Sequence, residues 1–174
     1  MATDGRQFAI IETSVLINFL RVDRVDLLAS HPAHRFVVID YVKREVTNRY
    51  RQQLTRLEAA LNAGLLVGDI DPKGVTLAEL QAYADLQSVN IGDGERGAIA
   101  AAFARGYAIA INDYRALKKL PAIYKALQRE DTTTIMVSLI RAGVLTVAEA
   151  DAIKADWEAN HRFRLKFPTF GDLV

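Results

Sequence analysis

The chain of 174 residues contains no cysteine, which excludes disulfide bonds and metal sites built on thiolates. It also lacks an apolar run long enough to span a bilayer, and residues 1–7 are polar and lack the apolar core of a secretion signal. We therefore expect a cytoplasmic protein that does not enter a membrane.

The formal net charge is only +1, less basic than is usual for a protein that wraps duplex nucleic acid. Binding to nucleic acid would then require basic residues to gather on one face of the fold. An alternative remains open for each cluster, because runs of charge are usually solvated helix faces. The clusters lie at residues 43–44, 49–51, 115–119 and 162–166.

Several standard catalytic motifs are also missing. There is no glycine-rich phosphate loop and no Gly-x-Ser-x-Gly turn. The first apolar run is not followed by Asp-x-Asp, which counts against the familiar phosphatase arrangement. The three histidines, His31, His34 and His161, lack the spacing of metal ligands on a helix, and we expect them on the surface or in the core.

The pattern that is present alternates short apolar runs with amphipathic segments. Hydrophobic residues make up 51% and charged residues 25%, a balance that predicts one globular domain over residues 1–174. The apolar runs are typical of strands buried on both faces, so we expect an α/β fold with a parallel sheet of about four or five strands flanked by helices. The expected strands cover 8–11, 36–39, 65–67 and 107–111. The expected helices cover 15–20, 25–29, 41–48, 52–63, 76–87, 92–105, 115–119, 132–142 and 146–160.

Three regions fall outside the regular alternation of strands and helices. Residues 122–129 fit a helix or a strand equally well, and residues 69–74 resemble a loop. Residues 130–174 contain two helical patterns and no strand pattern, so we expect a helical C-terminal extension of the same domain.

Four acidic residues occur where a parallel sheet places its ligands. Glu12 closes the first strand, Asp113 closes the strand 107–111, Glu45 follows the second strand, and Glu95 lies in the first turn of its helix. Strand carboxyl ends and the helix starts that follow them share one edge of a parallel sheet. We therefore expect these four side chains to converge there.

Glu95 has a further reason to need a partner. Ala98, Ile99 and Ala102 follow it at helical spacing, so its carboxylate shares the apolar face of the helix. An unpaired buried charge is costly, and a divalent metal ion would satisfy several carboxylates together.

Each acidic residue also has a structural explanation that stays open. Glu95 near a helix start is favourable to the helix dipole, and Asp113 can cap the helix after it. Glu45 can pair with Arg49 four residues later. Glu12 can be an exposed strand end.

Four segments resemble, in the same order, the four acidic segments of PIN-domain nucleases: residues 10–17, 38–46, 92–100 and 108–113. The resemblance covers roughly residues 8 to 120. The remainder, which includes the run Arg162-Phe163-Arg164, is similar to the tail of a prokaryotic PIN branch.

The resemblance implies a ribonuclease that depends on Mg²⁺ or Mn²⁺ and hydrolyses RNA phosphodiester bonds. Such proteins are often the toxin of a toxin–antitoxin pair, so an antitoxin protein and a homodimer are the implied assemblies. It implies that the metal ligands are Glu12, Glu45, Glu95 and Asp113.

Other residues receive lesser roles from the same resemblance. Thr13 and Ser14 support the first ligand, and Asp131 is a weaker candidate for an outer ligand. Arg96 and Arg115 adjoin two of the acidic residues and are candidates for contacts with the RNA backbone.

Glu12 stands where the family usually has aspartate. The longer side chain moves the carboxylate by about one bond length, and Mg²⁺ is strict about geometry. A weakened site, a preference for Mn²⁺ and a compensating backbone shift are all open. The same departure supports a rival interpretation, a catalytically silent PIN-fold module that binds RNA or a protein. A phosphohydrolase that acts on small phosphoesters is a second rival.

Overall fold

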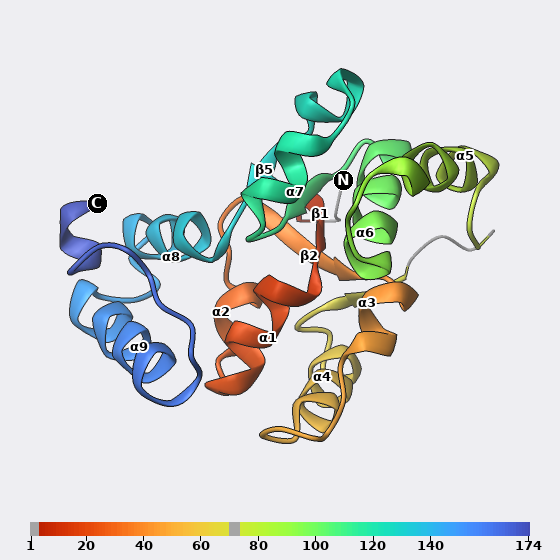
Figure 1. Ribbon diagram of the computed structural model, residues 1–174. Helices are drawn as coiled ribbons and strands as arrows, with labels where there is room; N and C mark the ends of the chain where they lie inside the picture. Colours follow the sequence, from red (N-terminus) through yellow and green to blue (C-terminus); the bar gives the residue numbers. More distant parts are fainter. Residues whose placement is uncertain (1–3, 70–73) are drawn as a thin grey trace.

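The computed structural model describes residues 4–69 and 74–174, and its centre is a parallel β-sheet (Figure 1). Every pair of neighbouring strands runs in the same direction, and the strand order is β3-β2-β1-β4-β5. This confirms the expected α/β class and the expected strand number. The strands are β1 (Gln7–Ile11), β2 (His34–Val38), β3 (Val67–Gly68), β4 (Ala108–Ala110) and β5 (Arg129–Glu130).

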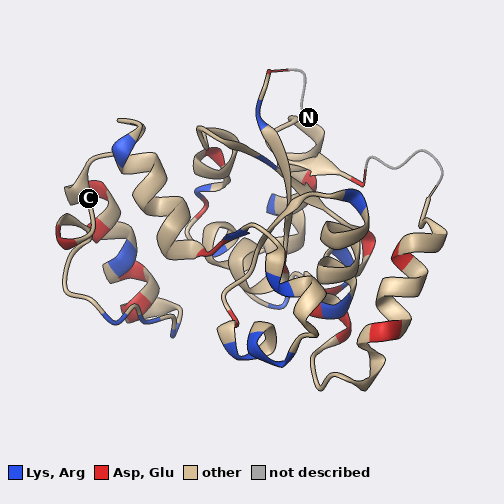
Figure 2. Cartoon of the chain, turned by 90° about the horizontal axis from the view of Figure 1, so that it is seen from above, with Lys and Arg blue, Asp and Glu red and all other residues tan. Residues whose placement is uncertain are grey.

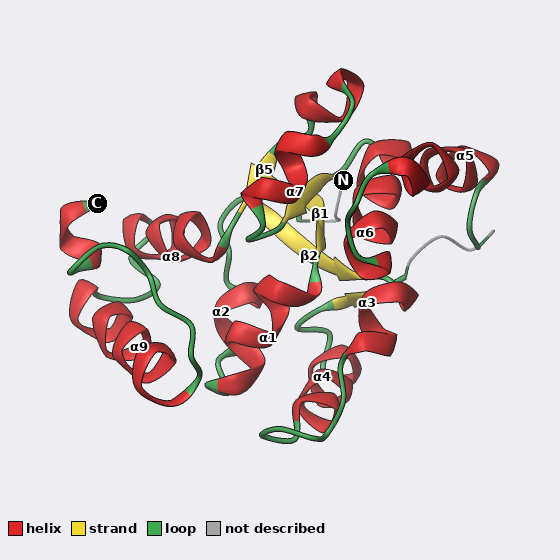
Figure 3. Cartoon of the chain, viewed as in Figure 1, coloured by secondary structure: helices red, strands yellow, loops and turns green. Residues whose placement is uncertain are grey.

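Helices surround the sheet (Figure 3). They are α1 (Thr13–Arg21), α2 (Val25–Ala29), α3 (Asp40–Glu45), α4 (Gln53–Asn62), α5 (Leu77–Asp85), α6 (Asp93–Arg105), α7 (Tyr114–Lys119), α8 (Thr132–Arg141) and α9 (Val147–Asn160). Short 3₁₀ turns add η1 (Leu86–Ser88), η2 (Ala122–Ala126) and η3 (Phe170–Asp172). Basic and acidic residues are spread over both ends of the molecule in Figure 2, as expected for a chain with almost no net charge.

The sheet and helix α6 form the core next to the acidic edge. Ile10 and Ile11 of β1 are fully buried, which explains the unbroken apolar run in the sequence. Helix α6 contacts β1 and β4 through small buried side chains, and its alanines allow a close approach to the strands. A Cβ atom at Gly97 would lie 2.7 Å from the ring of Tyr41 on α3, so glycine lets these two helices pack closely.

The C-terminal extension packs on helix α1. Trp157 of α9 is fully buried, and its indole Nε1 donates a hydrogen bond to the backbone oxygen of Asn18 at 2.8 Å. Its ring meets Phe19 edge-on, with ring centroids 5.9 Å apart. The extension therefore shares a hydrophobic core with the helix that follows β1.

Three local expectations differ from the structure. The third strand begins at Val67 rather than at residue 65, because Leu66 turns into the core and the chain pairs with β2 only from residue 67. The helix expected over 41–48 ends at Glu45, since Val46 is buried in an extended conformation. Residues 122–129 resolve into a 3₁₀ turn followed by β5. The loop expected over 69–74 lies partly outside the described residues.

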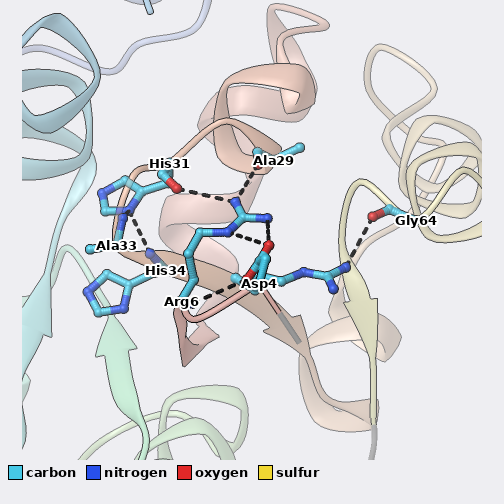
Figure 4. Close-up of polar contacts among 8 residues, drawn as sticks. Asp4, Arg6, Ala29, His31, Ala33, His34 and Gly64 are labelled. Carbon is cyan, nitrogen blue, oxygen red and sulfur yellow. Dashed lines mark hydrogen bonds and ion pairs between the residues drawn. The ribbon is translucent and has the colours of Figure 1, made fainter. Parts of the chain in front are cut away.

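A pair of buried histidines anchors the opposite edge of the sheet, where β2 begins (Figure 4). The backbone N–H groups of Ala33 and His34 donate to Nδ1 of His31 at 3.3 and 3.0 Å. The Arg6 guanidinium donates to the backbone oxygens of Ala29 and His31 at 2.7 and 3.2 Å. Burial lowers the pKa of His31 to about 4, and the neighbouring His34 adds to this effect. The histidines are core residues, which was one of the two expected placements.

Candidate active site

The candidate site lies where the strand order of the sheet reverses. Strand β1 pairs with β2 on one side and with β4 on the other. The chain therefore continues from β1 to β2 on one side of the sheet and from β4 to β5 on the other side. The backbone N–H of Glu12 donates to the oxygen of Ala110 at 2.9 Å, which holds the carboxyl ends of the two strands together. In open α/β sheets this kind of reversal creates a crevice in which ligands bind.

Glu12 is buried at this reversal of the strand order, with 4% of its surface exposed. Its side chain caps helix α1 by accepting hydrogen bonds from the backbone N–H of Ser14, at 2.9 Å, and from the Ser14 hydroxyl. Burial raises the pKa of Glu12 to about 6, and the negative charges of Glu95 and Glu45 add to the rise. The explanation of Glu12 as an exposed strand end is therefore wrong, since it is buried and close to two other carboxylates.

Glu45 is tied to the residue that follows Glu12. The Thr13 hydroxyl donates a hydrogen bond to Oε2 of Glu45, which links α1 to the end of α3. A Cβ atom at Gly94 would overlap the Glu45 carboxylate, so the first turn of α6 also approaches this group closely. Glu45 forms no ion pair with Arg49, although both residues are described, so the expected alternative pairing is wrong.

Glu95 lies at the start of α6, partly exposed. Its carboxylate accepts a hydrogen bond from the backbone N–H of Gly92 at 2.9 Å and so caps the helix. The three residues that follow it on the same helix face, Ala98, Ile99 and Ala102, are fully buried as expected. Glu95 therefore combines a favourable capping position with proximity to Glu12.

Asp113 follows β4 and caps helix α7. Its Oδ1 accepts hydrogen bonds from the backbone N–H groups of Arg115 and Ala116 at 2.8 and 3.2 Å. The capping explanation for Asp113 is thus confirmed, although a capping carboxylate keeps a second oxygen that is free to take a further role.

Sequence reasoning missed the residue before Asp113. The Asn112 side chain donates to the backbone oxygen of Ser14 at 3.0 Å and accepts from the backbone N–H of Thr132 at 3.0 Å. It therefore joins the ends of β1 and β4 to the start of α8. A polar residue directly after an apolar strand was a signal that this position faces the crevice.

Asp131, the weaker candidate, caps helix α8 by accepting a hydrogen bond from the backbone N–H of Thr134 at 2.8 Å. The Tyr114 hydroxyl donates a second hydrogen bond to it. Burial raises the pKa of Tyr114 to about 12, and the bond to Asp131 contributes to the rise. Asp131 therefore has a clear structural role at the rim of the crevice.

The two arginines proposed as RNA contacts differ in their surroundings. Arg96 donates to Asp93 at 2.6 Å and to the backbone oxygens of Leu86 and Ile91 at 3.3 and 3.1 Å. These bonds hold its side chain against the protein. Arg115 is exposed beside Asp113 and is free to contact a ligand.

The carboxylates fit a divalent cation by their chemistry. Oxygen donors are the ligands that Mg²⁺ and Mn²⁺ prefer, and a cation would stabilise the ionised Glu12 carboxylate against burial and against the charges of Glu95 and Glu45, which together raise its pKa. Across residues 4–69 and 74–174, however, no three acidic or histidine side chains lie close enough to share one metal ion. Convergence of all four acidic residues on a metal therefore stays a prediction.

Comparison with known proteins identifies the fold family. The family model that matches, DUF3368, is described as a PIN domain and covers residues 8–165. The chain belongs to the PIN-domain family. The match includes all four acidic segments and most of the C-terminal extension of this PIN domain. None of the curated proteins compared with the chain matches it.

A solved structure supports the same fold. This PIN domain is similar to the crystal structure of VapBC2 from Rickettsia felis bound to a DNA fragment from their promoter. The TM-score is 0.51 at 16% identity, and the match covers 71% of this chain and 98% of the other. Likeness at this identity concerns the fold. PIN domains are generally nucleases that use divalent metals, which agrees with the donor chemistry of the crevice. No helix in the described part of the chain is both long and apolar enough to cross a bilayer.

Proposed function

We propose that this PIN domain is an endoribonuclease that depends on Mg²⁺ or Mn²⁺ and cleaves RNA at the crevice between β1 and β4. The observation that carries the proposal is the buried Glu12 carboxylate, whose pKa is raised by burial and by the charges of Glu95 and Glu45. A buried carboxylate with a perturbed pKa beside other carboxylates lowers the stability of the fold. Such arrangements are typical of functional sites.

The residues that would hold the metal are Glu12, Glu45, Glu95 and Asp113. When bound, the metal would supply a water activated for attack and would neutralise charge on the phosphate. Ser14 fixes one oxygen of Glu12, and this bond leaves the second oxygen available.

The supporting residues orient the acidic side chains. The Thr13 hydroxyl holds the Glu45 carboxylate against α1. Asn112 ties β4 to α1 and α8 through both ends of its amide, so the chain that leads to Asp113 is fixed on two sides. Arg115 is exposed next to Asp113 and in this proposal would bind a phosphate oxygen of the RNA.

A role as the toxin of a toxin–antitoxin pair follows from the resemblance of the acidic segments to toxin-like PIN nucleases. The fold likeness to VapBC2 supports a search for a protein partner. A small reading frame adjacent to the gene, whose product binds this PIN domain and blocks RNA cleavage, would support that role. Formation of a homodimer is the second assembly to test, by light scattering of the purified protein.

A catalytically silent PIN module is the second candidate function. It is favoured by the glutamate at position 12 in place of aspartate, and by the finding that no three acidic or histidine side chains of residues 4–69 and 74–174 are arranged to hold one metal ion. Such a module would bind RNA or a protein partner without cleaving RNA.

The test is cleavage of a pool of single-stranded and structured RNAs with Mg²⁺, with Mn²⁺ and with EDTA. Asp113→Asn and Glu95→Gln serve as variants that keep side-chain size and remove a charge. We expect metal-dependent cleavage that both substitutions reduce at least about a hundredfold. Intact RNA with either metal would favour the silent module, and cleavage that persists in both variants would point to a contaminating nuclease.

A further inference from the structure

Two basic clusters that are distant in sequence meet at the far end of helix α1. The loop before α4 carries Arg51, whose guanidinium lies over the Tyr50 ring, and the chain after α9 carries Arg162, which lines one hollow together with Arg21 of α1. Figure 1 shows the C-terminal ends of α1 and α9 approaching each other at the lower edge of the view. Hydrogen bonds join the segments, because the Tyr50 hydroxyl donates to the backbone oxygen of Asn160 at 2.9 Å.

The three segments surround a hollow of about 390 Å³, lined by Arg21, Tyr50, Asn160, His161 and Arg162. The Tyr50 hydroxyl also lies 2.7 Å from Nδ1 of His161. The guanidinium of Arg21 lies over the Tyr50 ring, 5.6 Å from its centre. Its Nη1 donates to the His161 backbone oxygen at 3.3 Å, so the arginine is held in place at the hollow.

The hollow carries positive charge that the protein does not neutralise. Within the part of the chain that the structure describes, none of Arg21, Arg51 and Arg162 forms an ion pair. The Nε of Arg21 is a buried donor without a hydrogen-bond partner among the same residues. Asp156 lies 3.6 Å from Nε2 of His161. A buried donor left unpaired is costly, and an anion in the hollow would satisfy it.

Backbone strain concentrates on the same three segments. In the described residues, four non-glycine residues have positive φ: Asp23 at 56°, Arg51 at 51°, Gln52 at 50° and Arg162 at 54°. Asp23 follows α1, the next two precede α4, and Arg162 follows α9. Left-handed backbone at residues other than glycine is uncommon and tends to occur at binding sites. Two of the residues with this backbone conformation, Arg51 and Arg162, are arginines.

A partly exposed face of α1 connects the hollow to the acidic crevice. Thr13, Ile17 and Arg21 follow each other at intervals of four and are all half-buried, whereas Val15, Leu16 and Phe19 are buried. The backbone of Arg21 is about 12 Å from that of Thr13 along the helix axis. A strand of a few nucleotides can span this distance, so one RNA molecule could reach both places.

From this geometry we infer that the hollow is a phosphate subsite that binds the backbone of the RNA strand away from the cleaved bond. The ligand is a phosphate anion, and the guanidinium forks of Arg21 and Arg162 match its oxygens. The inference rests on the proposed ribonuclease function for the identity of the strand. The phosphate chemistry itself does not depend on that function.

The test uses RNA binding in EDTA, which prevents metal-dependent cleavage, with a labelled single-stranded RNA followed by fluorescence anisotropy at increasing KCl. We expect Arg21→Gln and Arg162→Gln each to weaken binding and to reduce the slope of log K against log[KCl] by about 0.7, the value for one phosphate contact on a single strand. Arg162→Lys should keep the slope while weakening binding less than Arg162→Gln.

Lys125→Gln is the matched control, because it removes one exposed positive charge on η2, far from the hollow in sequence. It should leave the slope unchanged. Arg162 is exposed, so we expect its substitution to leave the fold intact, and thermal unfolding of each variant checks this. Unchanged slopes in both Arg→Gln variants would overturn the subsite.

A second arm separates the subsite from the proposed function. Inorganic phosphate is titrated into the protein while the ring signals of His161 are followed by NMR, in the wild type and in Arg162→Gln. We expect saturable shifts in the wild type that the substitution abolishes. Shifts without any RNA binding would keep a free-phosphate site and count against the ribonuclease. RNA cleavage without shifts and without slope changes would keep the ribonuclease and overturn the subsite.

Discussion

Replacing Glu12 by glutamine should make the metal-free protein more stable at neutral and alkaline pH. The carboxylate is buried and lies near Glu95 and Glu45, and its pKa rises from an ordinary 4.5 to about 6. That difference corresponds to about 2 kcal/mol, by which the folded state favours the neutral form. Glutamine resembles the neutral carboxyl group, and its amide oxygen can keep the bonds from Ser14.

The gain should depend on pH with a definite sign. The pKa of Glu12 is higher in the folded protein than in the unfolded chain. Below pH 4.5 the group is protonated in both states and does not lower the free energy of unfolding, whereas stability is lost as pH rises through 6 and the buried carboxylate ionises. Glu12→Gln should therefore match the wild type near pH 4.5 and exceed it by up to about 2 kcal/mol at pH 8. Urea unfolding in EDTA at several pH values measures the difference.

Glu79→Gln supplies the control, because Glu79 is equally buried but is paired with Arg105 at 2.8 Å. Glu79→Gln removes one of the two carboxylates that pair with Arg105, while Asp69 stays 2.8 Å from the same guanidinium. The loss of this charged bond should destabilise the protein by about 2 kcal/mol, the opposite sign. If Glu12→Gln is no more stable than the wild type at pH 8, or if its effect does not change with pH, neither burial nor the nearby charges raise the pKa of Glu12 and the reasoning fails.

Three further predictions concern the site and the histidine pair. Gly94→Ala should reduce RNA cleavage at least about tenfold while the protein stays folded by circular dichroism, because the new Cβ displaces the Glu45 carboxylate; full activity would contradict this. Glu12→Asp should raise cleavage with Mg²⁺ relative to Mn²⁺ if the site suits the shorter acid, whereas loss of activity with both metals would mean that the backbone has adapted to glutamate. Protonation of His31 should remove about 3 kcal/mol of stability as pH falls from 6.5 through 4, since His31 stays neutral when folded, while Glu12 acts in the opposite direction over part of this range; urea unfolding of His31→Asn should lose the His31 contribution, and a pH dependence equal to that of the wild type would refute the assignment.

Most of the sheet was predictable because its strands are buried on both faces. The apolar runs around Ile10, Val37 and Ile109 stand out in the sequence, and their parallel pairing follows from the helices between them. Strand β5 could not be predicted from the pattern, since it contains only Arg129 and Glu130 and is an edge strand of the sheet. Two polar residues at an edge carry no period that distinguishes a strand from a loop.

The positions of the acidic residues relative to the strands were predictable, but their side-chain contacts were not. The places of Glu12 and Asp113 after adjacent strands follow from topology alone. The partners that each carboxylate takes do not, because Ser14, Thr13 and the backbone N–H groups of α7 compete for the same oxygens. Local hydrogen bonds of this kind depend on rotamers, which the sequence pattern does not specify.

The basic hollow illustrates a third limit. Its two arginines meet only when α9 packs on α1 through Trp157, since Arg21 contacts the backbone oxygen of His161, 140 residues further along the chain. Each cluster by itself has the composition of a solvated helix face. Only the packing of the C-terminal extension shows that Arg21 and Arg162 share one surface.

The measurement that tests the central claim most directly is a Mn²⁺ titration followed by electron paramagnetic resonance, in the wild type, Glu12→Gln and Asp113→Asn. Loss of one carboxylate ligand should weaken Mn²⁺ binding at least about tenfold in each variant, and Lys125→Gln should bind as the wild type does. If the wild type binds no Mn²⁺, or if both variants bind it with unchanged affinity, the acidic edge of the sheet is not a metal site.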